Sequence, residues 1–412
     1  MKRDIEILRE LAKKYAEFAL SEHCLKMPER YKKHNNLEIV RPPVLVFEVP
    51  WGELGGHAEM QTYCEDEWYR GLEWFFLVAL FQKKHFPCDN VVHPYFRSPV
   101  ALNSTGNGLN IEEDRIRTDT GSDIASHSYK DVLPDEEALS KLRMPEITLD
   151  AAETQKRLEL YGEIFDGIMP VKKAGVSVNF PVWDYISEYR GVENCMIDLY
   201  DRPEFVHKTV DLFTRIIEHE LDMYEKLNVL EADPYYIHCT PACTYDLSVK
   251  DMDNETITAK DVWCRAMAQP LSMVSPEMLD EFNLQYIQRA FDRCGLSYYG
   301  CCEPLDNKID KLRRYKNLRR ISISAWADAD IAADQIRGDY VLSYKPNPAF
   351  VASGKLDREA VEKDIRKTME ACRRNNTPCE FVLKDISTVN QNADVLTQWS
   401  DTVNGVIDEY FK

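Results

Sequence analysis

The alternation of short apolar runs with longer helical stretches constrains the fold of this 412-residue chain more than any other feature. Eight apolar runs have the length of strands, and helix-like segments follow most of them. Strands that are separated by helices pair in parallel through right-handed crossovers. The predicted strands cover residues 44–49, 90–96, 175–180, 235–239, 296–301, 318–324, 340–343 and 379–383.

Eight such units predict an α/β fold, a (β/α)8 TIM barrel over residues 44–412 that follows an N-terminal helical extension at residues 1–43. An open doubly wound sheet is the alternative. The sequence contains no GxGxxG or GxxxxGK[ST] motif, so neither a dinucleotide site nor a P-loop is indicated. Apolar periodicity predicts the main helices at residues 3–21, 66–84, 151–169, 203–227, 275–293, 358–375 and 391–410.

A long polar segment, residues 97–150, follows the second predicted strand and is rich in Asn, Ser, Thr, Gly and Asp. An insertion of this length in a compact domain is usually a lid, a binding loop or disorder. Loops that follow strands emerge at the mouth of a barrel. We therefore expect the insertion to cover the barrel mouth.

The composition excludes several classes of function. A net charge of −19 and a pI near 5.0 argue against a nucleic-acid or anionic membrane surface, because both need clustered positive charge. No apolar run approaches the roughly 20 residues that span a bilayer, and the N-terminus lacks the apolar core of a signal peptide. Twelve cysteines without regular spacing predict reduced thiols in the cytoplasm.

Residues that follow the predicted strands are the candidates for the active site, because the loops after parallel strands carry the chemistry. They are Glu48, Trp51, Glu53, His57, His93, Tyr95, Arg97, Asn179, Trp183, Asp184, His238, Cys239, Cys243, Asp246, Cys301, Cys302, Glu303, Trp326, Asp328, Asp330, Lys345, Asn347, Lys384, Asp385 and Ser387. This set is rich in His, Cys, Asp and Glu, the residue types that bind zinc or transfer protons.

The segment YYGCCEPLD at residues 298–306 is the most unusual of these strand ends. Adjacent cysteines do not easily form a disulfide, so we expect one thiol in the site and the other packed behind it. The competing interpretation is a pair of small buried hydrophobes with a solvated Glu303. A thiol, an imidazole and a carboxylate together can hold zinc, and the predicted metal ligands are His238, Cys302 and Glu303.

Glu303, Lys345 and Asp385 are the predicted catalytic residues, and without metal they would remain as an acid–base cluster. A lysine that leaves a buried strand needs an acidic partner or a ligand, and Asp385 could be that partner of Lys345. Flat ligands bind between aromatic side chains, which can equally be packing at the rim of a barrel. The predicted substrate contacts are Trp51, Tyr95, Asn179, Trp183, Trp326 and Asn347.

Residues 255–412 resemble the uroporphyrinogen decarboxylase superfamily, which includes zinc-dependent methyltransferases that serve corrinoid proteins. GCCE at residues 300–303 lies where the methyltransferase branch has a His-x-Cys-Gly strand end. This register places Cys302 on the zinc cysteine and Gly300 at the position of the zinc histidine. SYKPNPA at 343–349 corresponds to a Gly-Asn-x-x-Pro turn, and MAQPLSMVSPEM at 267–278 is similar to the Gln-x-x-x-x-Ser-Pro-Glu segment.

Two features of the family pattern are absent. VLKDIST at 382–388 lies where the methyltransferases carry a second zinc cysteine, and Asp385 or Ile386 occupies that position here. The arginine-rich motif with which the decarboxylase binds propionates is also missing, and without it eight substrate carboxylates lose their main binding partners. The resemblance covers the last 160 residues well and the first 170 poorly.

The resemblance therefore implies the methyltransferase branch, as the first methyltransferase of an anaerobic O-demethylase system. Such an enzyme takes a methyl group from a small methylated donor, an aromatic methyl ether being one candidate, and passes it to a corrinoid protein. Zinc or an acid would stabilise the leaving oxygen, with Lys345 and Asp385 to polarise or protonate it. The alternatives are a decarboxylase with a rearranged propionate clamp and a non-catalytic barrel that binds a porphyrinoid. A monomer and a homodimer are both compatible with the sequence.

Overall fold

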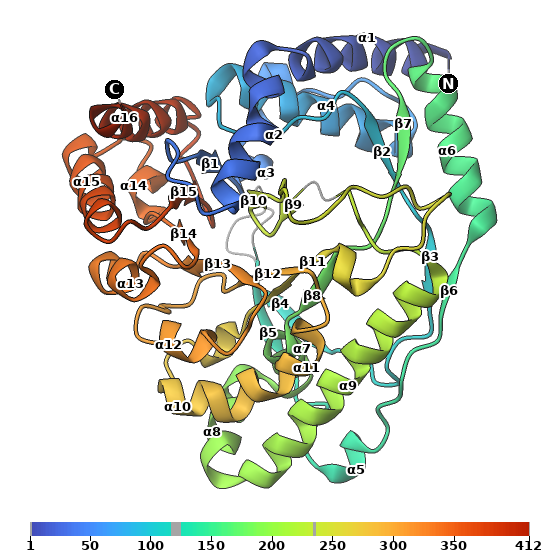
Figure 1. The fold of residues 1–412 in the computed structure, drawn as a ribbon. Coiled ribbons are helices and arrows are strands. Elements are labelled where there is room, and N and C mark those ends of the chain that lie inside the picture. The colour runs from blue at the N-terminus through green and yellow to red at the C-terminus, as the bar shows by residue number, and fades with distance from the viewer. Residues whose placement is uncertain (1, 117–124, 234–235, 412) are drawn as a thin grey trace.

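A parallel sheet of seven strands forms the centre of the protein (Figure 1). The computed structural model describes residues 2–116, 125–233 and 236–411. The strand order is β1-β15-β14-β13-β12-β11-β8, and all neighbouring pairs are parallel. The strands are β1 (Val44–Val46), β8 (Val178–Phe180), β11 (Trp263–Ala266), β12 (Leu296–Tyr299), β13 (Leu318–Ile323), β14 (Val341–Tyr344) and β15 (Cys379–Leu383). The predicted α/β class with parallel pairing is confirmed.

The sheet is barrel-like, and β1 and β8 are its two edges, with no ladder between them in the described part of the chain. Two predicted strands are wrong. Residues 90–95 are not a strand; β2 (Phe96–Pro99) begins only after Pro94, which has no N–H to donate, and pairs with β7 (Val171–Ala174) outside the central sheet. Residues 236–241 form a small antiparallel hairpin of β9 (Tyr236–Ile237) and β10 (Thr240–Pro241), while Tyr235 lies outside the described residues.

One strand was missed. β11 lies between β8 and β12 in the central sheet, but its sequence is only WCRA. Arg265 interrupts its apolar run, so periodicity alone does not identify it.

Helices cover the outer face of the sheet (Figure 1). The predicted helix at 3–21 ends at Ala19, and a second one begins after Ser21, which accepts a hydrogen bond from Cys24 N as an N-cap. The helices of more than four residues are α1 (Lys2–Ala19), α2 (Glu22–Asn35), α4 (Glu67–His85), α6 (Ala151–Phe165), α7 (Val182–Arg190), α8 (Val192–Asp201), α9 (Pro203–Leu227), α11 (Gln285–Phe291), α13 (Ala329–Ile336), α15 (Arg358–Arg374) and α16 (Asp394–Tyr410). The short ones are α3 (Trp51–Leu54), α5 (Glu136–Leu139), α10 (Pro276–Leu279), α12 (Ile309–Leu312) and α14 (Ala349–Ala352).

The insertion carries two small antiparallel pairs. β3 (Leu102–Ser104) pairs with β6 (Ile147–Leu149), and β4 (Glu113–Ile116) pairs with β5 (Ser126–Tyr129). Val132 N donates to the carbonyl of Tyr189 at 2.8 Å, which attaches the insertion to α7, the helix that follows the carboxyl end of β8. Residues 117–124 of the expected lid lie outside the described residues, so its coverage of the mouth stays a prediction.

Helix α2 packs against the inner face of the sheet, which we define as the face opposite the outer helices. Met27 and Tyr31 of α2 form one buried cluster with Leu45 of β1 and Val382 of β15. Arg320 Nη1 donates to Asn35 Oδ1 at 2.6 Å, near the amino end of β13. The amino-terminal helices therefore form part of the core.

Arg320 and Glu380 form an ion pair on this inner face, and both side chains are fully buried. Arg320 Nη2 lies 2.5 Å from Glu380 Oε2, and Ser343 Oγ and Thr240 Oγ1 donate to the two carboxylate oxygens at 2.5 and 2.8 Å. Burial alone would raise the pKa of Glu380, but the charges of Arg320 and Lys345 outweigh it and lower the pKa to about 2.

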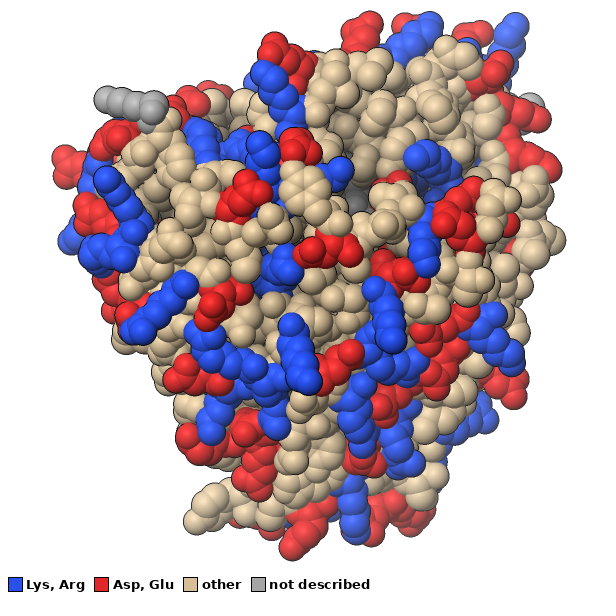
Figure 2. Space-filling view, viewed as in Figure 1, with Lys and Arg blue, Asp and Glu red and all other residues tan. Residues whose placement is uncertain are grey.

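The surface shows no single-sign patch on the face seen in Figure 2, where acidic and basic side chains are interspersed. Among the described residues, no helix is both long enough and apolar enough to span a bilayer.

We expect Glu380→Gln to lower the free energy of unfolding by about 3–5 kcal/mol, because it leaves the buried Arg320 charge without its counter-ion. Chemical denaturation measures the loss. Since the folded pKa lies below the ordinary value of 4.5, this contribution is complete above about pH 4.5 and disappears as the pH falls towards 2. The matched control, Glu10→Gln in an exposed pair with Lys13, should not change stability measurably.

Candidate active site at the carboxyl edge of the sheet

The loops that leave three strands, the neighbours β1 and β15 and the more distant β12, meet at the carboxyl edge of the sheet. Each strand ends in apolar residues and releases a polar pair or single residue into the same region, because parallel strands share one carboxyl edge. The turn of the β9–β10 hairpin adds an imidazole and a thiol. The residues are Glu48 after β1, Cys301 and Cys302 after β12, Lys384 and Asp385 after β15, and His238 and Cys239 in the hairpin turn.

The ammonium group of Lys384 is the centre of this cluster. Its Nζ lies 3.2 Å from Cys301 Sγ, 3.3 Å from Glu48 Oε2, 3.4 Å from Asp385 Oδ1 and 3.7 Å from Cys302 Sγ. Burial disfavours the ammonium form, but the thiolate of Cys301 and the neighbouring acidic groups outweigh it and raise the pKa of Lys384. Lys384 is therefore a fixed positive charge that is itself buried, whereas the side chains of Glu48 and Asp385 are 47% and 49% exposed.

The two adjacent thiols differ in their pKa. Their sulfurs lie 3.4 Å apart, and Cys302 Sγ also lies 3.0 Å from Asp385 Oδ2 as a possible donor. The hydrogen bond from Cys302, together with the charge of Lys384, lowers the pKa of Cys301 despite its burial. The same bond and the burial of the thiol raise the pKa of Cys302. Cys301 is thus the more acidic thiol of the pair, and Cys302 donates the hydrogen bond to it.

The pKa values of Glu48 and Asp385 are shifted in opposite directions. Burial and the hydrogen bond to Asp385 raise the pKa of Glu48. Burial opposes ionisation of Asp385 too, but the hydrogen bond from Glu48 and the charge of Lys384 outweigh it and lower the pKa of Asp385. The backbone N–H of Asp385 also donates to Glu48 Oε2 at 3.2 Å. Of the two carboxyl groups, Glu48 consequently keeps its proton to the higher pH, beside an ammonium group.

Backbone strain is concentrated here. Glu48, His238 and Asp385 have φ angles of 49°, 56° and 56°, in the left-handed region that non-glycine residues rarely adopt. Three such residues from three separate segments meet in one cluster. Conformations of this kind persist where the surrounding structure enforces them, and they concentrate at functional sites.

His238 is a neutral imidazole. Its Nδ1 lies 2.8 Å from Cys239 Sγ, and its ring stacks on Tyr298 with the ring centres 5.5 Å apart. Burial, followed by the charges of Lys345 and Lys384, lowers the pKa of His238 to about 2. It can accept or donate a hydrogen bond but does not carry a positive charge at neutral pH.

Lys345, a predicted catalytic residue, lies deeper on the inner face. Its Nζ donates to Ser343 Oγ at 2.6 Å and to Tyr298 OH at 3.1 Å. Asp385, which we considered as its partner, forms its ion pair with Lys384 instead.

The third predicted catalytic residue, Glu303, holds the loop in place. Its two oxygens accept the backbone N–H groups of Ala268 at 2.8 Å and Cys301 at 2.6 Å. Burial raises the pKa of Glu303, and these backbone bonds oppose the rise. The three predicted metal ligands therefore have separate partners. Glu303 accepts hydrogen bonds from backbone N–H groups, His238 contacts Cys239 Sγ, and Cys302 lies beside Lys384.

The predicted substrate contacts are not gathered in one place. Trp183 is buried in the core and donates to the carbonyl of Phe282 at 2.8 Å, whereas Trp326 is 78% exposed. Tyr95 OH donates to Asp233 at 2.6 Å, and Asn347 accepts from Ala349 N at 2.9 Å as part of a turn. Asn179 lies on β8, and its buried Oδ1 has no partner among the described residues.

Trp51 lines an aromatic cavity of about 560 Å³ between α1, α4 and the edge of β1. Phe47, the residue before Glu48, contributes to it and packs edge-on against Tyr236, with the ring centres 5.3 Å apart. The cavity wall also includes Trp74, Phe75 and Lys83. An apolar cavity of this size, next to the acidic cluster, suits a small organic ligand.

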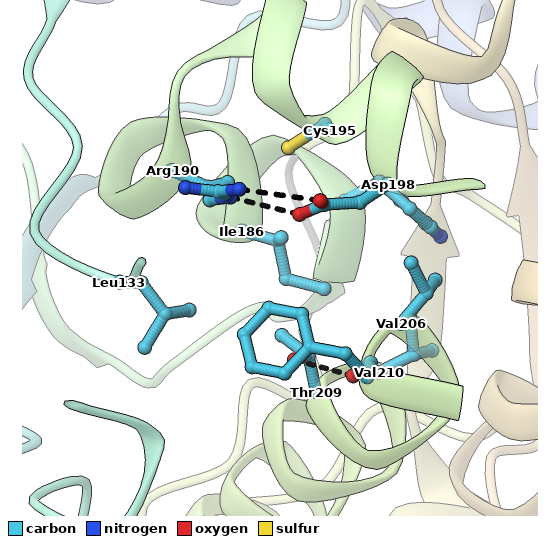
Figure 3. Close-up of a pocket in the computed structure, with 10 residues that line it drawn as sticks. Leu133, Ile186, Arg190, Cys195, Asp198, Val206, Thr209 and Val210 are labelled. Carbon is cyan, nitrogen blue, oxygen red and sulfur yellow. Dashed lines mark hydrogen bonds and ion pairs between the residues drawn. The ribbon is translucent and has the colours of Figure 1, made fainter. Parts of the chain in front are cut away.

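A second, much smaller cavity lies between α7, α8 and α9 (Figure 3). The Arg190–Asp198 ion pair closes one side of it, and Leu133, Ile186 and Val206 line the rest. Its volume of about 10 Å³ admits at most one water molecule, so it is a packing defect of the helical layer.

The residues of the cluster do not fit a zinc ion as they lie. Lys384 occupies the space between the donor atoms, and its positive charge competes with a cation there. Within the described residues, the one group of three metal-binding side chains whose donor atoms lie within 4.8 Å of each other is His57, Glu59 and His85, on the surface. Zinc at His238, Cys302 and Glu303 remains a prediction.

The backbone at Gly300 explains why this chain has no histidine where the resembled methyltransferases have their zinc histidine. Its φ of 96° belongs to the left-handed side, and a Cβ there would lie 2.6 Å from Leu305 Cδ1 and 3.0 Å from the Ser322 carbonyl. No side chain fits at this position, so the zinc histidine of the resembling family has no space here.

Comparison with known proteins gives one useful likeness. No family model matches the chain, and no curated protein matches it. Among solved structures, a methyltransferase from Methanosarcina mazei is similar, with a TM-score of 0.52 and 11% sequence identity over 94% of this chain and 99% of that one. At this identity, the likeness shows the fold. The structural likeness covers nearly the whole chain.

Two of the charged residues at this edge, Glu48 and Lys384, were strand-end candidates but were not among the predicted catalytic residues. Their importance comes from contacts across the sheet, since Glu48 and Asp385 lie 337 positions apart in the sequence. Cys301 was expected to be either the inward thiol or the packing one. The position of Lys384 makes it the charged member.

We predict that Gly300→Ala lowers the free energy of unfolding by about 1–3 kcal/mol, through left-handed strain and the clash with Leu305. Denaturant titration measures it. Gly162→Ala is the matched control, because nothing lies within 4 Å of its added Cβ in helix α6 and alanine favours a helix. Equal effects of the two substitutions would contradict the assigned role of Gly300.

Cys302→Ala should raise the pKa of Cys301, because it removes the hydrogen bond that stabilises the thiolate. The pH dependence of alkylation by iodoacetamide at Cys301, followed by peptide mass spectrometry, should have its midpoint below the ordinary value of 9.0 in the native protein. The midpoint should move upward in the variant. Cys243→Ala, outside the cluster, should leave it unchanged, and an unshifted midpoint in Cys302→Ala would refute the pairing.

Proposed function

We propose that this protein is a methyltransferase that takes a methyl group from a small methylated donor and delivers it to a corrinoid protein. One observation carries the proposal: a carboxyl pair, Glu48 with a raised pKa and Asp385 with a lowered pKa, is held against the Lys384 ammonium group at the carboxyl edge of the sheet. The full-length likeness to a methyltransferase and the resemblance to the uroporphyrinogen decarboxylase superfamily support it.

Removal of a methyl group from an ether leaves an alkoxide or phenolate, which needs a proton or a positive charge. Glu48 holds a proton at its carboxyl group, and Lys384 supplies the charge that stabilises the developing oxyanion. A bound corrinoid would supply the nucleophile for the methyl carbon. Asp385 accepts the hydrogen bond of Glu48 and so fixes the orientation of the acid.

The thiols balance the charge of the lysine. Cys301 as a thiolate and Asp385 as a carboxylate keep the ammonium form of Lys384 stable in a buried site.

The zinc prediction is separate from this scheme, and metal analysis of protein purified without chelators tests it. Stoichiometric zinc that is lost in Cys302→Ala would support it.

A methyl-transfer assay with reduced cobalamin and candidate methyl ethers tests the function, with methylcobalamin formation followed by absorbance. We expect Glu48→Gln to lower kcat by about 10²–10⁴-fold, because the leaving oxygen then lacks its proton. Since the acid acts in its protonated form, kcat should fall as the pH rises through the raised pKa of Glu48, and the variant should lose this dependence. Exposed Glu10→Gln is the control and should keep full activity.

The alternatives give different results in the same protein preparation. Carbon dioxide release from uroporphyrinogen without methyl transfer from any donor would indicate a decarboxylase. Binding of a porphyrinoid with neither reaction would indicate the non-catalytic barrel. Either outcome would overturn the proposal.

A further inference from the structure

Three side chains of the kinds that bind metals meet on the protein surface from two separate segments. His57 and Glu59 belong to the loop after β1, residues 47–60, and His85 is the last residue of α4. One donor atom of each residue lies within 4.8 Å of those of the other two. Two imidazoles and one carboxylate are a ligand set with which proteins bind zinc while leaving a fourth position open.

The distances between the donor atoms are close to those of a metal site. Glu59 Oε1 lies 3.2 Å from His85 Nε2 and 4.0 Å from His57 Nδ1. In tetrahedral zinc sites, bonds of about 2.0–2.2 Å place the donor atoms about 3.3–3.5 Å apart. The longer distance therefore has to shorten by roughly half an ångström, which a small rotation of the partly exposed His57 side chain provides. A metal bond to His57 Nδ1 would replace the long hydrogen bond that this nitrogen accepts from Glu59 N at 3.3 Å.

Packing orients both imidazole rings. Phe81, one helical turn before His85, is buried, and its ring centre lies 4.1 Å from that of His85 and 5.2 Å from that of His57. Thr397 Oγ1 donates to the carbonyl of His85, which attaches the end of α4 to α16. Side chains that are already held in place lose less conformational freedom when they bind a ligand.

The two oxygens of the Glu59 carboxylate have different partners. Oε2 accepts a hydrogen bond from Lys84 Nζ at 2.7 Å, whereas Oε1 faces the histidines. The hydrogen bond from Lys84 lowers the pKa of Glu59, so this carboxylate is ionised at neutral pH. A metal on Oε1 leaves the contact with Lys84 intact. The side chain of Lys84 is 62% exposed, so water and salt screen its repulsion of the metal.

An ordinary surface ion pair does not account for the whole group. Histidine–glutamate pairs also occur at His207 and Glu281, 3.4 Å apart, and at His127 and Glu113, 2.6 Å apart. Over the described ranges, neither of these pairs has a third metal-binding side chain close enough to complete a site. The second imidazole beside Glu59 is the feature that distinguishes a metal site from an ion pair.

We propose that His57, Glu59 and His85 bind a divalent transition metal, zinc above all, which fastens the loop after β1 to the end of α4. Imidazole ligands favour zinc and its neighbours in the first transition series over magnesium and calcium, which prefer sets of oxygen ligands. The site is separate from the thiols and from Lys384, and the inference does not depend on the proposed methyl transfer.

The two segments that the metal would connect are both walls of the aromatic cavity. Trp51 belongs to the loop after β1, and its ring centre lies 6.1 Å from that of Phe81 of α4. Trp74 and Phe75 of α4 also line the cavity. The same loop contains Glu48, so a metal at its far end would restrict the motion of the segment that carries the candidate acid.

Calorimetric titration of the full-length, chelator-treated protein with zinc chloride tests the site, with magnesium chloride for comparison. We expect zinc to bind and magnesium to give no saturable heat. His57→Gln and His85→Gln should each weaken zinc binding by more than the roughly 10–100-fold that the loss of an outer-shell partner costs, because each removes a ligand. His207→Gln is the matched control, since it removes a histidine that also pairs with a glutamate, and it should keep the native affinity.

Hydrogen exchange locates the bound metal. Zinc should slow the exchange of backbone amides in residues 57–60 and 82–86 of the native protein, because it joins the two segments. The same addition should have no effect on these residues in His85→Gln. Circular dichroism confirms that each variant is folded.

The outcomes separate this site from the other proposals. Zinc affinity that is unchanged in both His57→Gln and His85→Gln would refute the site. Zinc that is lost in Cys302→Ala and retained in His57→Gln would assign the metal to the end of β12 and overturn the inference. Zinc bound at His57 and His85 without methyl transfer would support the inference and refute the methyltransferase, and methyl transfer by a protein that binds no zinc at these residues would do the reverse.

Discussion

The Lys384 ammonium group is the interaction on which the candidate site depends. Two thiols and two carboxyl groups from three strand ends lie around it, and without a cation these four groups would repel each other as they ionise. Lys384 is 2% exposed, so its charge is poorly screened by water. The ammonium group lowers the pKa of all four groups, while burial and the hydrogen bond within each pair leave Glu48 and Cys302 as the members with the raised pKa.

The geometry of the cluster follows from the parallel sheet and is maintained by strain. All strands of the central sheet release their loops at one edge, which brings β1, β12 and β15 together although they are far apart in the chain. Left-handed φ angles at Glu48, His238 and Asp385 turn these side chains towards each other. Glu303 secures the β12 loop through two backbone N–H groups, and Gly300 lets that loop pass close to Leu305 and Ser322.

Charge balance divides the inner face of the sheet into two parts. At the amino end, Arg320 and Glu380 neutralise each other, with Asn35 of α2, Thr240 and Ser343 as further partners. Arg265, in the same register as Arg320 through Tyr298, and Lys345, after the end of β14, form no ion pair with a carboxylate of the described residues. One region is a closed structural network. The other contains basic side chains that lie outside this network, and groups with shifted pKa values of this kind are more common at functional sites.

The sequence by itself determined the parallel α/β class, because apolar runs of strand length alternate with amphipathic stretches. It also placed Cys302, Lys345 and Asp385 correctly after their strands, since this depends on local pattern alone. It could not identify β11, where Arg265 breaks the apolar run, or reject residues 90–96, whose composition is strand-like apart from Pro94. The partners of each charged group depend on distances between segments hundreds of residues apart. Only the tertiary structure decided that Glu303 binds backbone N–H groups and that the thiols and carboxyl groups surround Lys384, because charge pairing depends on distances in space and not on spacing along the chain.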